Sequence, residues 1–245
     1  MITIMKNEVC PVDSAHPFPP SPRDVTGGAP VPVLRPSAIA YHEAGHCLAR
    51  RFLGMALGGA TIIAGRDFGG LTYGPGGDGE KVSAASIRDD AELLCAKVLA
   101  WRPAPGETRD KYGFWLAFIQ SQMIETLAGR QAETLAGYDP LDEAVSTDVA
   151  IAKLYAEVLC ISDGAAEAFI DYCSIEAREL LKMHLRALQA VASALQERET
   201  LDCEAIDRII LEAEAGIELE KEKRRRQEMA GMVVRATDFH TRARQ

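Results

Sequence analysis

The feature that most constrains this chain is the pentapeptide HEAGH at residues 42–46. It lies in the stretch 37–53, where an N-cap serine, a closing glycine and nearly continuous apolar residues predict a buried helix. Side chains four residues apart share one face of a helix, so both histidines would point the same way. Two buried imidazoles without partners would be costly, and the pentapeptide therefore calls for a partner inside the fold.

A metal ion is the partner that this spacing favours. His42 and His46 could both reach one Zn²⁺ at about 2.0–2.1 Å, the usual zinc–nitrogen distance. Glu43 is offset by one residue and would stand beside the ion, where a general base takes a proton from water. Two hydrogen-bonded core histidines are one alternative. A purely structural zinc is another, although structural sites normally have four ligands rich in cysteine.

A catalytic zinc also needs a third protein ligand. The extended form H-E-x-x-H-x-x-G-x-x-H is absent, because Ala49 and Phe52 occupy its later positions. We therefore expect a carboxylate from a later helix. Spacing alone leaves six candidates open, namely Glu125, Glu133, Asp139, Asp142, Glu143 and Asp148.

The rest of the chain predicts a mainly α fold. Of its 245 residues 47% are hydrophobic and 26% charged, which suits a globular chain with ample core. Residues 60–64 and 70–73 read as two short strands joined by a glycine-rich turn, which predicts a small β-hairpin near the first helix. Beyond residue 85 the apolar periodicity predicts helices at 87–101, 113–136, 146–161, 164–173, 175–198 and 202–215.

Charge and composition exclude several classes of protein. A net charge of −9 argues against nucleic acid as the main partner, and no apolar run is long enough to span a bilayer. We read no secretory signal and no C-x-x-C pair among the six cysteines, which predicts a cytoplasmic protein with reduced thiols.

Three regions differ in composition. Residues 1–36 hold eight of the twelve prolines and read as an extended arm. Residues 37–215 would form the folded domain. Residues 216–245 form a basic tail, since residues 219–245 carry eight Lys/Arg against four Asp/Glu. Such a tail could dock on an acidic surface of this chain or of a second copy, which makes a homo-oligomer a candidate assembly.

Four segments, in order along the chain, resemble the peptidase domain of FtsH-type proteases, the membrane-anchored AAA+ zinc endopeptidases. The first, IAYHEAGHCLARRFLG, spans residues 39–54 and resembles the zinc-binding helix of that family. LAGRQAE at 127–133 resembles its Gly-Arg-x-Ala-Glu helix, and STD at 146–148 resembles the segment with its third zinc ligand. ALQERETLDCEAI at 194–206 resembles its terminal pair of helices.

The resemblance implies a helical, zincin-like peptidase domain in which Asp148 is the third zinc ligand and Glu43 the general base. Glu133 is the alternative ligand. Thr147 departs from the pattern, because the family usually has Asn before the aspartate. Without the family, an aspartate in the first turn of a helix often only caps that helix.

The implied reaction is hydrolysis of peptide bonds in peptides or unfolded polypeptides. The strand formed by Gly70, Leu71, Thr72 and Tyr73 would bind an extended substrate by strand addition. Phe68 and Tyr73 could line a side-chain pocket, and packing into the core is the alternative for each. No Walker A motif occurs in the sequence, so we expect the peptidase domain alone, with any ATPase acting in trans. The alternatives are a zinc-binding, non-proteolytic adaptor of the same fold and an interaction protein dominated by its helices.

Overall fold

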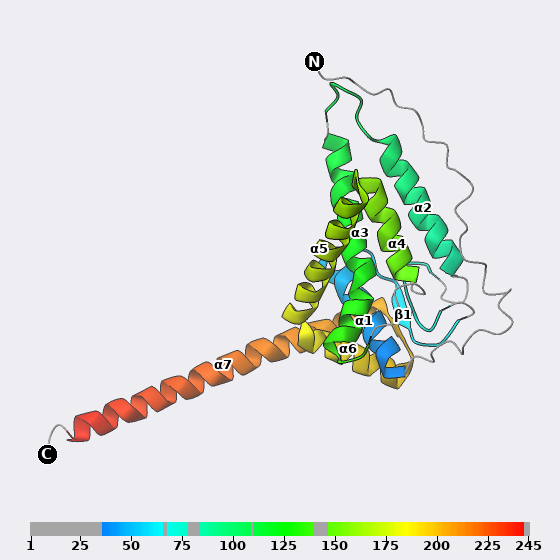
Figure 1. Ribbon diagram of the computed structural model, residues 1–245. Coiled ribbons are helices and arrows are strands. Elements are labelled where there is room, and N and C mark those ends of the chain that lie inside the picture. Colours follow the sequence, from blue (N-terminus) through cyan, green and yellow to red (C-terminus); the bar gives the residue numbers. More distant parts are fainter. Residues whose placement is uncertain (1–35, 66–67, 78–83, 109, 140–146, 243–245) are drawn as a thin grey trace. The chain divides into compact units, whose positions relative to one another are not determined.

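The structure is a computed structural model that describes residues 36–65, 68–77, 84–108, 110–139 and 147–242. Apart from Pro36, the predicted proline-rich arm lies outside these residues. The described part of the chain is mainly helical and carries one small antiparallel sheet, which confirms the predicted fold class at that level (Figure 1).

Seven helices make up most of the described residues. They are α1 (Pro36–Phe52), α2 (Ala84–Ala100), α3 (Asp110–Leu135), α4 (Thr147–Leu159), α5 (Asp163–Met183), α6 (Leu185–Arg198) and α7 (Cys203–Arg242). The four predicted helices from 37–53 to 146–161 match α1 to α4 to within three residues at each end. None of the helices in this part of the chain combines the length and the apolar composition that a bilayer span requires.

The predicted break between residues 173 and 175 is wrong. α5 runs through this position, because its buried residues Cys173, Ala177 and Leu181 follow one another in steps of four on a single helix face. The chain leaves helical geometry at His184 instead, where φ is −114°, and α6 begins at the next residue.

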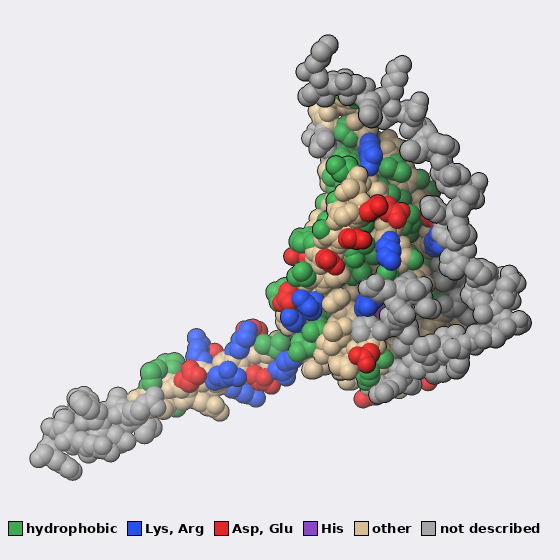
Figure 2. Space-filling view, in the orientation of Figure 1, with side chains coloured by type: hydrophobic (Ala, Val, Ile, Leu, Met, Phe, Trp, Pro, Cys, Tyr) green, Lys and Arg blue, Asp and Glu red, His purple; other side chains and the backbone are tan. Residues whose placement is uncertain are grey.

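The last helix is longer than the predicted 202–215. α7 continues through Gly216 as far as Arg242, so the basic tail is helical over most of its length. Ile206 and Ile210, near its start, are buried in the core, whereas residues 221–230 are almost all exposed. Figure 2 shows mixed acidic and basic side chains along this exposed part of α7.

The sheet contains three short strands, β1 (Gly59–Thr61), β2 (Leu71–Tyr73) and β3 (Thr200–Asp202), in the order β2-β1-β3. The predicted hairpin is confirmed, because β1 and β2 pair antiparallel with Ala60 opposite Thr72. β3 was not predicted. It follows Glu199, whose φ of 63° turns the chain between α6 and the sheet. Among the described strands, β2 lies at an edge.

The core is built around α1, which packs against both α3 and α6. Small residues let α1 and α3 approach each other closely. A Cβ added to Gly45 would lie 2.6 Å from the carbonyl oxygen of Ala128 and 2.8 Å from the Cβ of Ala132. This close contact brings the polar side chains of α3 within reach of those on α1.

Candidate metal centre

Three potential ligands from two helices meet at one point. The Nε2 atoms of His42 and His46 on α1 are 3.0 Å apart. Asp148, in the first turn of α4, places its Oδ2 atom 3.1 Å from the first of these nitrogens and 3.5 Å from the second. All three atoms lie within 4.8 Å of one another, and the group could hold a metal ion. Ligands about 2.1 Å from a tetrahedral zinc ion lie roughly 3.4 Å apart, so these separations need little adjustment.

Helix α3 provides a hydrogen-bond acceptor for the other ring nitrogen of each histidine. His42 Nδ1 lies 2.5 Å from Oε1 of Glu133, which is itself buried. His46 Nδ1 lies 2.9 Å from the backbone carbonyl oxygen of Glu125. Both rings therefore keep the proton on Nδ1 and turn Nε2 toward Asp148. This orientation by outer partners is common for histidines that bind metals.

The antiparallel packing of α1 and α3 explains why these pairs form. His42 faces Glu133, and Arg50, two turns further along α1, faces Glu125, two turns earlier on α3. Between these pairs lies Gly129. A Cβ there would come within 2.6 Å of His46 Nε2 and within 2.7 Å of His42 Nε2. Only glycine leaves room for both rings at this position.

The charges around the histidines favour a cation. Burial disfavours a protonated His42 ring, but hydrogen bonds to Asp148 and Glu133 outweigh it and raise the pKa to about 9. The pKa of His46 is also raised well above its usual value, against burial, by Asp148 and Glu125. Although burial opposes it, the two histidines hold the pKa of Asp148 far below its ordinary range.

The carboxylates thus attract positive charge to the point where the three ligand atoms meet. A divalent cation would satisfy them while the imidazoles stay neutral, as metal ligation requires. The second oxygen of Glu133, Oε2, is buried and has no hydrogen-bond partner among the described residues. This donor set of two imidazoles and one carboxylate fits a zinc ion.

Glu43 is held from the side of the sheet. Its carboxyl Oε2 accepts a 2.8 Å hydrogen bond from the hydroxyl of Thr72 on β2. Gly70 lies directly against it, since an added Cβ would come within 2.7 Å of Glu43 Oε1 and of a methyl group of Ile39. Burial raises the pKa of Glu43, whose side chain is enclosed between α1 and β2. It is therefore a stronger base than an exposed glutamate.

The other residues predicted from the sequence lie in varied places. Leu71 is buried and Tyr73 is half-buried on β2. Between them lies Thr72, whose hydroxyl donates a hydrogen bond to Glu43. Asp139 is exposed, outside the histidine group. The two remaining ligand candidates, Asp142 and Glu143, lie outside the described residues.

Sequence reasoning named Glu125 and Glu133 only as candidate ligands. In the structure both carboxylates, with Arg50 beside that of Glu125, lie behind the histidines rather than at the meeting point of the ligand atoms. One signal could have shown this. Glu125, Gly129 and Glu133 are spaced by four residues, which places them on one face of α3, like the histidines on α1.

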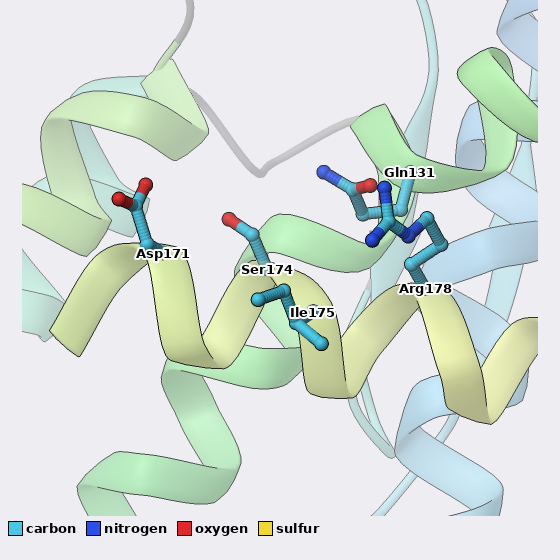
Figure 3. A pocket seen from close by; sticks show the side chains of 5 residues that line it. All are labelled: Gln131, Asp171, Ser174, Ile175 and Arg178. Atoms are coloured by element: carbon cyan, nitrogen blue, oxygen red, sulfur yellow. The ribbon is translucent and has the colours of Figure 1, made fainter. Parts of the chain in front are cut away.

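A separate pocket of about 250 Å³ lies between α3 and α5. Its lining comprises Gln131, Asp171, Ser174, Ile175 and Arg178 (Figure 3). Because Gln131 is two residues from both Gly129 and Glu133, it points about 200° away from them around α3. The pocket is therefore not part of the histidine site.

No protein-family model matches the chain, and no curated protein matches it.

Proposed function

We propose that this chain is a zinc-dependent endopeptidase whose folded domain is similar to the peptidase domain of FtsH-type proteases. The observation that carries the proposal is the convergence of His42 Nε2, His46 Nε2 and Asp148 Oδ2, with the buried carboxyl group of Glu43 on the same helix turn. The spacing along α1 and the order of the resembling segments support it. Three protein ligands leave one position of a tetrahedral zinc ion for water or substrate, which is typical of catalytic sites.

The chemistry divides between the ion and this chain's own residues. Zinc, when bound, acts as a Lewis acid that polarises a carbonyl group and lowers the pKa of water. Glu43 takes up the proton of the attacking water and later delivers it to the leaving amine. Thr72 keeps the Glu43 carboxyl group oriented for both transfers through its 2.8 Å hydrogen bond. The carboxylate of Glu133 and the backbone carbonyl oxygen of Glu125 hold the two histidine rings so that both Nε2 atoms point toward Asp148.

The substrate that suits this site is an extended polypeptide. β2 pairs with β1 and has no second neighbour among the described strands, so a peptide could add to its outer edge close to Glu43. Main-chain hydrogen bonds would dominate such binding, which predicts weak sequence preference. With no Walker A motif in the sequence, folded substrates would need an ATPase in trans.

The first test is metal analysis of the purified chain together with cleavage of casein, with and without a chelator. We expect about one zinc ion per chain and hydrolysis that the chelator abolishes. Zinc without any cleavage would favour the non-proteolytic adaptor instead.

The second test is Glu43→Gln. The amide can still accept the hydrogen bond from Thr72 but cannot take a proton, so zinc content should persist while hydrolysis falls by about 100-fold or more. Glu92→Gln is the matched control, because Glu92 is an exposed residue of α2 that pairs with Arg88 one turn earlier on the same helix. Equal hydrolysis by the wild-type chain and Glu43→Gln would contradict the proposed mechanism.

A further inference from the structure

Behind His46 lies a mostly buried ion pair that joins α1 to α3. Arg50 Nε donates a 2.8 Å hydrogen bond to Oε1 of Glu125, and these side chains are only 21% and 8% exposed. The same carboxylate oxygen lies 3.4 Å from Nδ1 of His46. Glu125 thus faces His46 with two groups. Its backbone carbonyl oxygen accepts the 2.9 Å hydrogen bond from Nδ1, and its carboxylate, which accepts from Arg50, lies beside that bond.

Arg50 also reaches beyond the two helices. Its Nη1 atom donates to the backbone carbonyl oxygen of Ala56, at 3.2 Å, in the segment that leads from α1 to β1. Arg50 is therefore fixed at two points, and its Nε–H group holds the Glu125 oxygen in one position beside His46.

We propose that Glu125 is a positioning residue for the candidate metal ligand His46 and that Arg50 holds its carboxylate in place. The inference rests on the proposed metal site. A negative charge beside the Nδ1–H group makes the imidazole a stronger ligand and keeps Nε2 directed at the ion. Each histidine then has a carboxylate close to Nδ1, as the direct acceptor for His42 and beside the backbone acceptor for His46.

Arg50 has a necessary part in this arrangement. A buried carboxylate without a cation would be strongly destabilised as an anion and would take up a proton or turn away. The 2.8 Å hydrogen bond from Arg50 Nε supplies that cation to the Glu125 carboxylate. The charge beside His46 is therefore preserved.

The neighbouring residue on α1 offers a matched control. Arg51 pairs with Asp207 on α7, so the two adjacent arginines tie α1 to different helices. This second pair is more exposed, at 31% and 39%, and no contact joins it to either histidine. Asp207→Asn removes the carboxylate that pairs with Arg51, at a position outside the candidate metal site.

The experiment compares Glu125→Gln with Asp207→Asn in the full chain. Glutamine keeps the shape and one acceptor oxygen but removes the charge. The readout is the zinc dissociation constant, measured by competition with a chromophoric chelator, together with the absorption spectrum of the Co²⁺-loaded chain. We expect Glu125→Gln to weaken zinc binding by about 10-fold or more and to alter the Co²⁺ spectrum. Asp207→Asn should leave both readouts as in the wild type.

Arg50→Lys serves as a second variant if Glu125→Gln does not fold. Lysine keeps the charge but cannot hold Oε1 of Glu125 and the Ala56 carbonyl oxygen with the geometry of the guanidinium group, so zinc binding should again weaken. Wild-type affinity in the folded Glu125→Gln chain, or failing that in Arg50→Lys, would overturn the inference while leaving the proposed function intact. Equal weakening by Asp207→Asn would also overturn it, because the effect would then be a general loss of helix packing. Absence of zinc binding by the wild-type chain would overturn both.

Discussion

Charged residues are held in opposite ways at the α1–α3 contact and along α7 beyond Gly216. At the contact, Glu125 and Glu133 are 6% and 4% exposed, and each is fixed against a histidine from the other helix. On this part of α7, Glu220 pairs with Arg186 of α6 at the surface. The charges that follow it pair with neighbours on the same helix, as Glu222 does with Arg226. The same residue types therefore orient candidate metal ligands in one region and lie at the surface of a helix in the other.

The energetic consequences differ as much as the environments. Exposed pairs three or four residues apart on a helix contribute about 0.3–0.5 kcal/mol each. Removing one partner of a buried pair costs about 3–5 kcal/mol, because the other charge stays behind without compensation. Changes at the α1–α3 contact should therefore affect metal binding and folding far more than changes in the outer part of α7, which begins at Lys221.

The largest effect is expected from Gly129→Ala. The added methyl group would overlap both histidine rings, since its Cβ position is 2.6 Å from His46 Nε2 and 2.7 Å from His42 Nε2. At least one ring must move, so zinc affinity should fall by about 100-fold. The overpacked contact should also lower the free energy of unfolding by about 1–3 kcal/mol. Chelator competition and denaturant unfolding measure the two quantities.

The same substitution on α7 provides the comparison. Gly216 has no atom within 4 Å of an added Cβ, and Gly216→Ala should stabilise the helix by up to about 1 kcal/mol without changing zinc affinity. Equal zinc affinity in Gly129→Ala and Gly216→Ala would contradict the tight geometry described for the α1–α3 contact.

Local periodicity predicted the parts of the structure that depend on neighbours along the chain. The helix with His42 and His46, the hairpin and the start of α4 at Thr147 all follow from residues close in sequence. The third ligand did not follow from spacing, because six carboxylates fitted equally well. Only the resemblance to a family singled out Asp148 before its position was known.

The missed features depend on contacts between distant segments. β3 is three residues long and forms only because β1 offers an edge about 140 residues earlier in the chain, so no local pattern marks it. The roles of Glu125 and Glu133 depend on the register of α3 against α1, which close packing at Gly45 and Gly129 fixes. Sequence periodicity gives the face of each helix but not how two helices are aligned.

The next effect, of intermediate size, concerns pH. His42 has its pKa raised from 6.5 to about 9, so its partners stabilise the folded, metal-free chain most below pH 6.5. This contribution is lost as the pH rises through about 9. We therefore expect the thermal unfolding midpoint of the chelator-treated chain to fall between pH 6.5 and pH 9. Cys47, whose pKa burial raises to about 12, should stay neutral throughout.

Zinc should respond to pH in the opposite direction. Metal ligation requires neutral imidazoles, so zinc competes with protons and its affinity should rise over the same pH interval. A metal-free chain whose midpoint does not change between pH 6.5 and pH 9 would show that the pairing of His42 with Asp148 and Glu133 does not stabilise the fold.

The smallest effect is expected from removing residues 221–245. Among the described side chains, the contacts that join α7 to the rest of the domain lie before this point. Ile206 and Ile210 lie in the core, Glu214 pairs with His184 and Glu220 pairs with Arg186. The residues removed from 221 to 232 are largely exposed and make local pairs such as Arg226 with Glu222. We therefore expect the truncated chain to keep the wild-type unfolding midpoint and zinc affinity.

The same truncation tests whether the outer part of α7 serves assembly. It removes the eight basic residues of the tail, whose charge is opposite to that of the rest of the chain. If these residues dock on an acidic surface of a second copy, truncation should reduce the oligomer seen by light scattering. High salt should act in the same way, because exposed charges are screened beyond about 10 Å at 0.1 M. An oligomer unchanged by both treatments would contradict docking through charge. Loss of soluble protein or of zinc binding on truncation would show instead that the outer part of α7 supports the fold. Its exposed charges would then contribute to stability as well as to the surface of the helix.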